Sequence, residues 1–147
     1  MNQKNRILYL ISRSVSRLKY YSIKRFSDQG ITISPSQMGI LFFLNIKGEM
    51  NMSALSSSMG LDNSTLTRLV DKLVKAGFAE RIPNPLDRRG FLVQITEPGR
   101  KEGGRAAAIS QEINRKILEG FTESEIEIFI RVLESFLIKF NTEKGEL

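Results

Sequence analysis

Apolar residues recur every three or four positions along most of the chain, a spacing that predicts helices with one buried face. The first predicted helix covers residues 5–27. A second is predicted to begin at Ser34, because Pro35 suits the first helical position and Gln37 can complete a capping box. This second helix is apolar on nearly every side as far as Ile46, so we expect it at the centre of the fold.

Two shorter helices are predicted next, over residues 53–59 and 63–76, with a tight turn that begins at Gly60. Gly77 then occupies the position that favours a helix end. The second of these helices has an apolar stripe formed by Leu66, Leu69, Val70 and Leu73. Its opposite stripe is polar, which predicts a helix packed on one side and open to solvent on the other.

The spacing of apolar residues then changes to two, and residues 78–82 and 91–95 are predicted to form short strands. Residues 83–90 between them contain two prolines, an asparagine and a glycine, which predicts a loop. Two further helices are predicted, one from Thr96 to about Gly120 and one that starts at a capping box on Thr122. The expected fold class is mainly α with a small β-hairpin.

The helices predicted at residues 53–59 and 63–76 have the lengths and the short turn of a helix-turn-helix. In that motif the first helix braces a second helix, which enters the major groove of DNA. The predicted recognition residues are Asn63, Ser64, Thr65, Thr67, Arg68 and Lys72. The N-terminus of the second helix also suits a phosphate. An ordinary helical hairpin with solvated hydroxyls is the alternative, and the basic hairpin that follows favours DNA binding.

The net charge of +6 is unevenly distributed along the chain. Residues 1–33 carry seven Lys or Arg and one Asp, whereas residues 63–101 carry eight basic and four acidic residues. Residues 102–147 carry six basic and nine acidic residues. A basic surface separated from an acidic one favours a polyanionic partner, above all nucleic acid.

Several classes of chemistry are excluded by composition. The chain has no His and no Cys, which excludes disulfides, Cys/His zinc sites and catalysis by Ser-His-Asp or Cys-His groups. Glu123, Glu125 and Glu127 lie in the first turns of a helix, where the helix dipole explains them better than a metal does. We therefore expect no enzyme, cofactor or metal site.

No stretch approaches the roughly 18 apolar residues of a membrane span, so we expect a cytoplasmic protein without a membrane partner.

The stretch from Asn63 to Gly99 resembles the MarR family of winged-helix regulators. In that family the β-hairpin that follows the recognition helix is called the wing. Its signature is an Asp, any residue and an Arg, followed further on by Val, any residue, Leu and Thr. Here it reads Asp87-Arg88-Arg89 and then Val93-Gln94-Ile95-Thr96, with Ile in place of Leu. Gly90 stands where Ser is common, and Pro98 stands where Lys or Ala is more usual. The resemblance covers essentially the whole chain, residues 1–147.

The resemblance implies a role for each residue of the wing. Arg89 would enter the minor groove, Asp87 would hold it through a charge-assisted hydrogen bond, and Arg88 would support phosphate binding. The implied DNA-binding part is residues 34–96, flanked by dimerisation helices in residues 1–33 and 97–147. The implied function is that of a sequence-specific regulator, a repressor relieved by a small-molecule effector, which binds a pseudo-palindromic operator as a homodimer.

The first and last helices carry more apolar residues than one wall of a small domain needs, so we expect them to form the dimer interface. The predicted interface residues are Ile7, Ile11, Phe129, Leu133, Phe136, Leu137 and Phe140. The alternative is that these residues only cover the winged helix of their own chain.

Family members often bind small phenolic or aromatic anions in a cleft beside the dimer helices. The resemblance therefore implies an effector cleft, and its candidate residues are Arg13, Arg17, Tyr20 and Tyr21. A solvated basic helix face that adds attraction to DNA is the favoured alternative for these four. For the whole chain, the competing hypothesis is a protein-interaction module, which would bind DNA without sequence preference.

Overall fold

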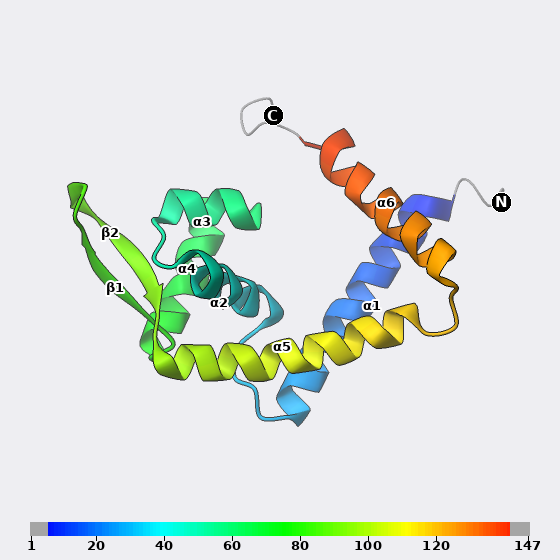
Figure 1. The fold of residues 1–147 in the computed structure, drawn as a ribbon, viewed down its shortest axis with the longest axis horizontal. Coiled ribbons are helices and arrows are strands. Elements are labelled where there is room, and N and C mark those ends of the chain that lie inside the picture. Colours follow the sequence, from blue (N-terminus) through cyan, green and yellow to red (C-terminus); the bar gives the residue numbers. More distant parts are fainter. Residues whose placement is uncertain (1–5, 142–147) are drawn as a thin grey trace. The chain divides into compact units, whose positions relative to one another are not determined.

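The computed structural model describes residues 6–141, and Figure 1 shows its helices and the single hairpin. The elements are α1 (Ile7–Asp28), α2 (Pro35–Lys47), α3 (Met52–Met59), α4 (Asn63–Lys75), β1 (Ala79–Asn84), β2 (Asp87–Ile95), α5 (Glu97–Leu118) and α6 (Glu123–Lys139). The predicted fold class, mainly α with a small β-hairpin, is confirmed. Residue 5, the predicted start of the first helix, lies outside the described residues. The chain divides within α5 into two compact units, the first ending at Gln111.

Side-chain caps start the helices where the sequence predicts them. The Ser34 hydroxyl accepts from the Gln37 amide at 3.2 Å, and the Gln37 side chain accepts from the Ser34 amide at 2.9 Å. At the start of α6, Glu125 accepts from both the amide of Thr122 (2.8 Å) and its hydroxyl (2.9 Å). The amide bond, and then the hydroxyl bond, holds the pKa of Glu125 below its usual range.

The core of the first unit forms where α2, α3 and α4 meet β2. Its fully buried side chains include Ile40, Leu41, Leu44, Leu55, Leu66, Val70, Leu73 and Val93. The expectation that α2 lies at the centre of the fold is confirmed, because α3, α4, β2 and α1 all contact it. One strip of its surface nevertheless stays open, where Phe42 is 56% exposed and Ile46 is 63% exposed.

The hairpin is longer than predicted. Its strands pair antiparallel from Ala79 opposite Ile95 to Pro83 opposite Phe91, with an irregularity after Pro83. Only Pro85 and Leu86 form the turn, so the predicted loop over residues 83–90 is wrong. A strand accepts Pro83 because each strand of a two-stranded ribbon has an open edge that needs no amide donor.

Two close contacts attach the hairpin to the helices. The amide of Met50 donates to the carbonyl of Val93 at 3.0 Å, and Val93 returns the bond at 2.8 Å. At the start of α5 the backbone of Gly99 passes so close to the chain before β1 that an added Cβ would lie 1.9 Å from the carbonyl oxygen of Phe78. Only glycine allows this approach.

A buried carboxylate joins α5 to the segment between α1 and α2. Glu102 is 7% exposed and accepts from the amide (2.8 Å) and the hydroxyl (3.2 Å) of Thr32. Its other oxygen accepts from Arg105 at 2.8 Å, and Arg105 also donates to the carbonyl of Gln29 at 2.7 Å. These bonds satisfy the buried carboxylate and hold the connection in place.

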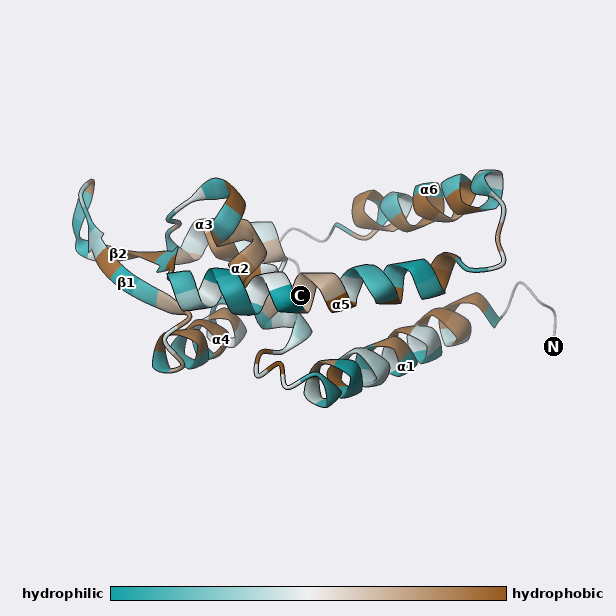
Figure 2. Cartoon of the chain, turned by 60° about the horizontal axis from the view of Figure 1, so that its bottom comes forward, coloured by the Kyte–Doolittle hydropathy of each residue, from teal (hydrophilic) through white to brown (hydrophobic). Residues whose placement is uncertain are grey.

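The second unit contains the end of α5 and the whole of α6. Apolar positions, brown in Figure 2, alternate with polar ones along α6, and none of its residues is buried. Within residues 6–141 no helix is both long and apolar enough to cross a membrane.

Candidate nucleic-acid interface

Helices α3 and α4 form the predicted pair with a short turn between them. The Asn51 side chain caps α3 by accepting from the amide of Ala54 at 2.7 Å, and Gly60 ends α3 in the left-handed conformation at φ 62°. The buried Ser56 hydroxyl then donates to the carbonyl of Leu61 at 2.6 Å, which holds the turn against α3. The angle between the helices is thus set by packing and by hydrogen bonds.

One face of α4 packs into the core and the other faces solvent. Leu66, Val70 and Leu73 are fully buried. The predicted recognition residues lie on the opposite side, where Thr65 is half-buried and the exposed ones are Asn63, Ser64, Thr67, Arg68 and Lys72. The structure therefore brings all six together on an accessible surface.

Asp62 organises the first turn of this surface, a role that the sequence analysis missed. Its carboxylate accepts from the amide of Thr65 at 2.8 Å and from the hydroxyls of Ser64 and Thr65, both at 2.7 Å. The two bonds from Thr65, amide first, and then that from Ser64 hold the pKa of Asp62 far below its usual range. An Asp directly before the first helical residue is an N-cap signal that could have revealed it.

The Asp62 cap affects what the first turn of α4 offers to a ligand. The hydroxyl hydrogens of Ser64 and Thr65 point to the carboxylate, so their oxygens are left as acceptors. The carboxylate also brings a negative charge to the N-terminus of α4, and the suitability of that N-terminus for a phosphate stays a prediction. The hydroxyl of Thr67 likewise donates to the carbonyl of Asn63, at 2.7 Å.

Two side chains fold back on the tip of the wing and fix its shape. Asn84 accepts from the amide of Leu86, and Asp87 accepts from the amide of Arg89, each at 3.0 Å. Asp87 thus binds the main-chain amide of Arg89, whereas the resemblance implies a charge-assisted bond that holds the arginine itself. The side chains of Arg88 and Arg89 are exposed.

The basic side chains of α4 and the wing fall into two groups. Arg81 forms an ion pair with Asp71 and lies over the ring of Phe91, 5.0 Å from its centroid. Five other cations make no ion pair or side-chain hydrogen bond within residues 6–141, namely Arg68, Lys72, Lys75, Arg88 and Arg89. These five charges lack a counterion in the described part of the chain.

The predicted effector residues lie along α1 but do not act alike. Arg17, Tyr20 and Tyr21 line a shallow hollow together with Ser16. Arg13 instead donates to the hydroxyl of Tyr9 at 2.7 Å on its own helix. Since α1 supplies every one of these residues, the hollow is formed by the surface of a single helix.

The predicted interface residues are accessible. Exposed fractions are 54% for Ile7, 47% for Phe129, 44% for Leu133, 77% for Leu137 and 71% for Phe140. Ile11 and Phe136 are half-buried. The rings of Phe136 and Phe140 meet edge to face, with centroids 5.9 Å apart.

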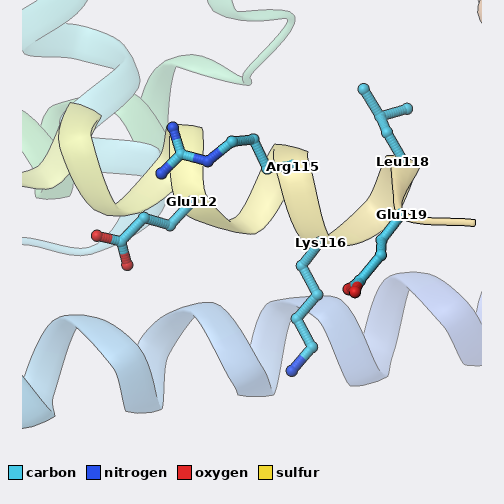
Figure 3. A pocket seen from close by; sticks show the side chains of 5 residues that line it. All are labelled: Glu112, Arg115, Lys116, Leu118 and Glu119. Carbon is cyan, nitrogen blue, oxygen red and sulfur yellow. The ribbon is translucent and has the colours of Figure 1, made fainter.

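A second hollow lies at the end of α5 and has mixed charge (Figure 3). Glu112, Lys116 and Glu119 project from one side of the helix, whereas Arg115 and Leu118 project from the other. Acids and bases alternate at the spacing of one helical turn, the arrangement of a solvated helix face. This hollow therefore gives no sign of a binding site for an anion.

A braced helix with an exposed polar face, followed directly by a hairpin with a basic tip, defines the winged helix-turn-helix class of proteins. The profile of the MarR family matches residues 33–91. The HTH-type transcriptional regulator YsmB of Bacillus subtilis is 35% identical over 101 residues, which is 69% of each chain. The chain therefore belongs to the MarR family of transcriptional regulators.

Solved structures share the fold over nearly the whole chain. A probable transcriptional regulator from Pseudomonas aeruginosa has a TM-score of 0.79 at 26% identity and covers 90% of this chain and 98% of its own. A mutant of Escherichia coli MarR, complexed with operator DNA, has a TM-score of 0.76 at 24% identity and covers 93% of this chain and 99% of its own.

Proposed function

We propose that this chain is a sequence-specific transcriptional regulator that binds double-stranded DNA as a homodimer. The observation that carries the proposal is the set of five cations without counterions on α4 and the wing. Phosphates supply the missing negative charge, and counterions released from DNA add to the binding free energy. The complex of the Escherichia coli relative with operator DNA supports the same reading.

The two parts of the surface have different tasks. Arg68 lies in the exposed first half of α4, next to acceptor oxygens on Ser64 and Thr65. An arginine there can pair with the O6 and N7 atoms of guanine in the major groove. Arg89 at the wing suits the minor groove, where a narrow groove raises the negative potential. Lys72 and Arg88 then contact phosphates.

A homodimer would present this surface twice. Two recognition helices related by a two-fold axis meet successive major grooves about one turn of DNA apart, which requires a pseudo-palindromic operator. We assign two surfaces to dimerisation, the exposed apolar side chains of α6, such as Leu137, and those at the start of α1, such as Ile7.

A repressor relieved by a small phenolic or aromatic anion is the finer form of the proposal. Arg17, Tyr20 and Tyr21 offer a cation and two aromatic rings along one hollow. A phenolic acid bound there more tightly in the DNA-free dimer would weaken DNA binding by the same coupling factor.

The test is in vitro selection of bound duplexes from random DNA, repeated with phenolic acids present. We expect a pseudo-palindrome to be enriched. On that duplex, Arg68→Ala and Arg89→Ala should each weaken binding by about tenfold or more at physiological salt, and Arg68→Ala should also relax the preference at one base pair of each half-site.

The matched control is Arg100→Ala, which removes the same charge from an arginine that donates to Asn45 at 2.6 Å. We expect this variant to bind within about twofold of the parent. Parent-like affinity of both Arg68→Ala and Arg89→Ala would show that the site is assigned wrongly. If selection enriches no motif, the chain is a protein-interaction module instead.

A further inference from the structure

We propose that Leu86 is an apolar wedge at the tip of the wing, which enters the minor groove and bends the duplex by opening a base step. This inference rests on the proposed binding of DNA and adds an activity to it, the deformation of the operator. Leu86 lies outside the core, so the packing of the chain does not explain an apolar residue at this position.

The first support is the exposure and the place of Leu86. Its side chain is 95% exposed, the highest fraction among the large apolar residues of the described chain. A single exposed leucine is ordinary on a protein surface. Leu86, however, lies in the turn of the hairpin, and Figure 1 shows that this turn is the end of the ribbon farthest from α5.

The second support is that the tip is held in one shape. Pro85 restricts its own φ angle, and the amide of Leu86 donates to the Asn84 side chain at 3.0 Å. On the other side of the turn, Asp87 accepts from the amide of Arg89 at 3.0 Å. A side chain on a preorganised turn loses little conformational freedom when it binds, so the wedge is ready before contact.

The third support is size and charge. The minor groove is about 6 Å wide. The strand axes of the ribbon are about 4.8 Å apart, and its side chains make it wider than the groove. The turn contains only Pro85 and Leu86, so it enters the groove more readily than the ribbon does. Proteins that kink DNA insert leucine and similar apolar side chains between base steps from the minor groove. Arg88 and Arg89 follow within three positions of Leu86 and lack counterions in the described chain, so they can hold the tip against the phosphates.

The experiment separates bending from binding. A selected duplex carries a fluorophore pair at its ends to report the bend and 2-aminopurine, in successive probes, at each base step that the wing can reach. We expect the parent to shorten the end-to-end distance and to raise 2-aminopurine fluorescence at one step of each half-site. The step should be TA or CA/TG, because these unstack most easily.

Leu86→Ser should lose the 2-aminopurine signal and most of the bend, with about five- to twentyfold weaker binding. The salt dependence of binding should keep its slope, because no charge changes. Leu86→Met retains an apolar wedge and should bend DNA as the parent does. Arg88→Ala is the reverse control, which should lower the salt slope and leave the bend in place.

The outcomes are distinguishable from failure of the proposed function. If Leu86→Ser bends and unstacks the duplex as the parent does, the wedge is overturned while DNA binding stands. If the parent binds the operator tightly without a bend or a 2-aminopurine signal, the wedge is likewise overturned and DNA binding stands. If the parent prefers no duplex over random DNA, the proposed function fails and the wedge fails with it.

Discussion

Asp62 accepts three hydrogen bonds at the start of α4, from one amide and two hydroxyls. These bonds stabilise its ionised form and orient Ser64 and Thr65, so one carboxylate affects both the stability of the recognition helix and the groups that it offers to DNA. A neutral amide in its place still caps a helix, but accepts fewer of these bonds.

A pH series on Asp62→Asn tests this role. The pKa of Asp62 is lowered by folding from about 3.9 in the unfolded chain. Its contribution to stability is therefore present above about pH 4 and is lost as the pH falls toward the folded pKa. We expect the parent to have a higher Tm than Asp62→Asn at pH 7, and the difference to shrink steadily at pH 4, 3 and 2.5.

The control for loss of one negative charge is Glu49→Gln, at an exposed position after α2. A Tm difference between the parent and Asp62→Asn that is equal at pH 7 and pH 3 would mean that the ionised carboxylate contributes nothing.

Within the first unit, the start of α5 contacts two separate segments of the chain. Its first turn lies against the carbonyl of Phe78, and its Glu102 holds Thr32 in the segment between α1 and α2. The wing and the end of α1 are therefore both attached to one helix.

Two glycines on α5 provide a matched pair of substitutions. Gly99→Ala places a Cβ 1.9 Å from the carbonyl oxygen of Phe78, whereas a Cβ at Gly104 meets nothing within 4 Å. We expect Gly99→Ala to lower the free energy of unfolding by about 1–3 kcal/mol. Gly104→Ala should raise it by about 0.5–1 kcal/mol, because alanine restricts the unfolded helix segment. Urea denaturation measures both, and equal effects would contradict the close approach at Gly99.

At the scale of the whole molecule, the unpartnered apolar surface is the main unexplained feature. Leu137 and Ile138 are 77% and 80% exposed in the single chain, and none of the residues of α6 is buried. Contiguous apolar surface of this kind marks protein contacts. A second copy of the chain is the partner that the proposed function requires.

Leu137→Asp tests dimerisation and links it to DNA binding. A charge placed in an apolar interface costs several times the thermal energy, so we expect a particle of twice 16.7 kDa for the parent and a larger monomer fraction for the variant in analytical ultracentrifugation. Affinity for the palindromic operator should fall with the dimer fraction. Glu127→Gln on the same helix is the control. A parent that sediments as a monomer at micromolar concentration would contradict the dimer.

The helix bounds, the helix-turn-helix and the position of the wing follow from the sequence alone, because caps and apolar periodicity act over a few residues. Ser34, Thr122 and Gly60 each act on chain that lies within about one helical turn. The family resemblance added roles for the wing residues, which stay predictions, and the Asp62 cap was also within reach of local reasoning.

Only the tertiary structure decided which side chains already have partners. Arg81 pairs with Asp71 across the start of the wing, and Glu102 binds Thr32, which is 70 positions away in the chain. It also decided that Phe42 stays exposed and that Pro83 continues a strand. The physical reason is that each outcome depends on segments that meet only after folding, and the periodicity of one segment carries no information about the other.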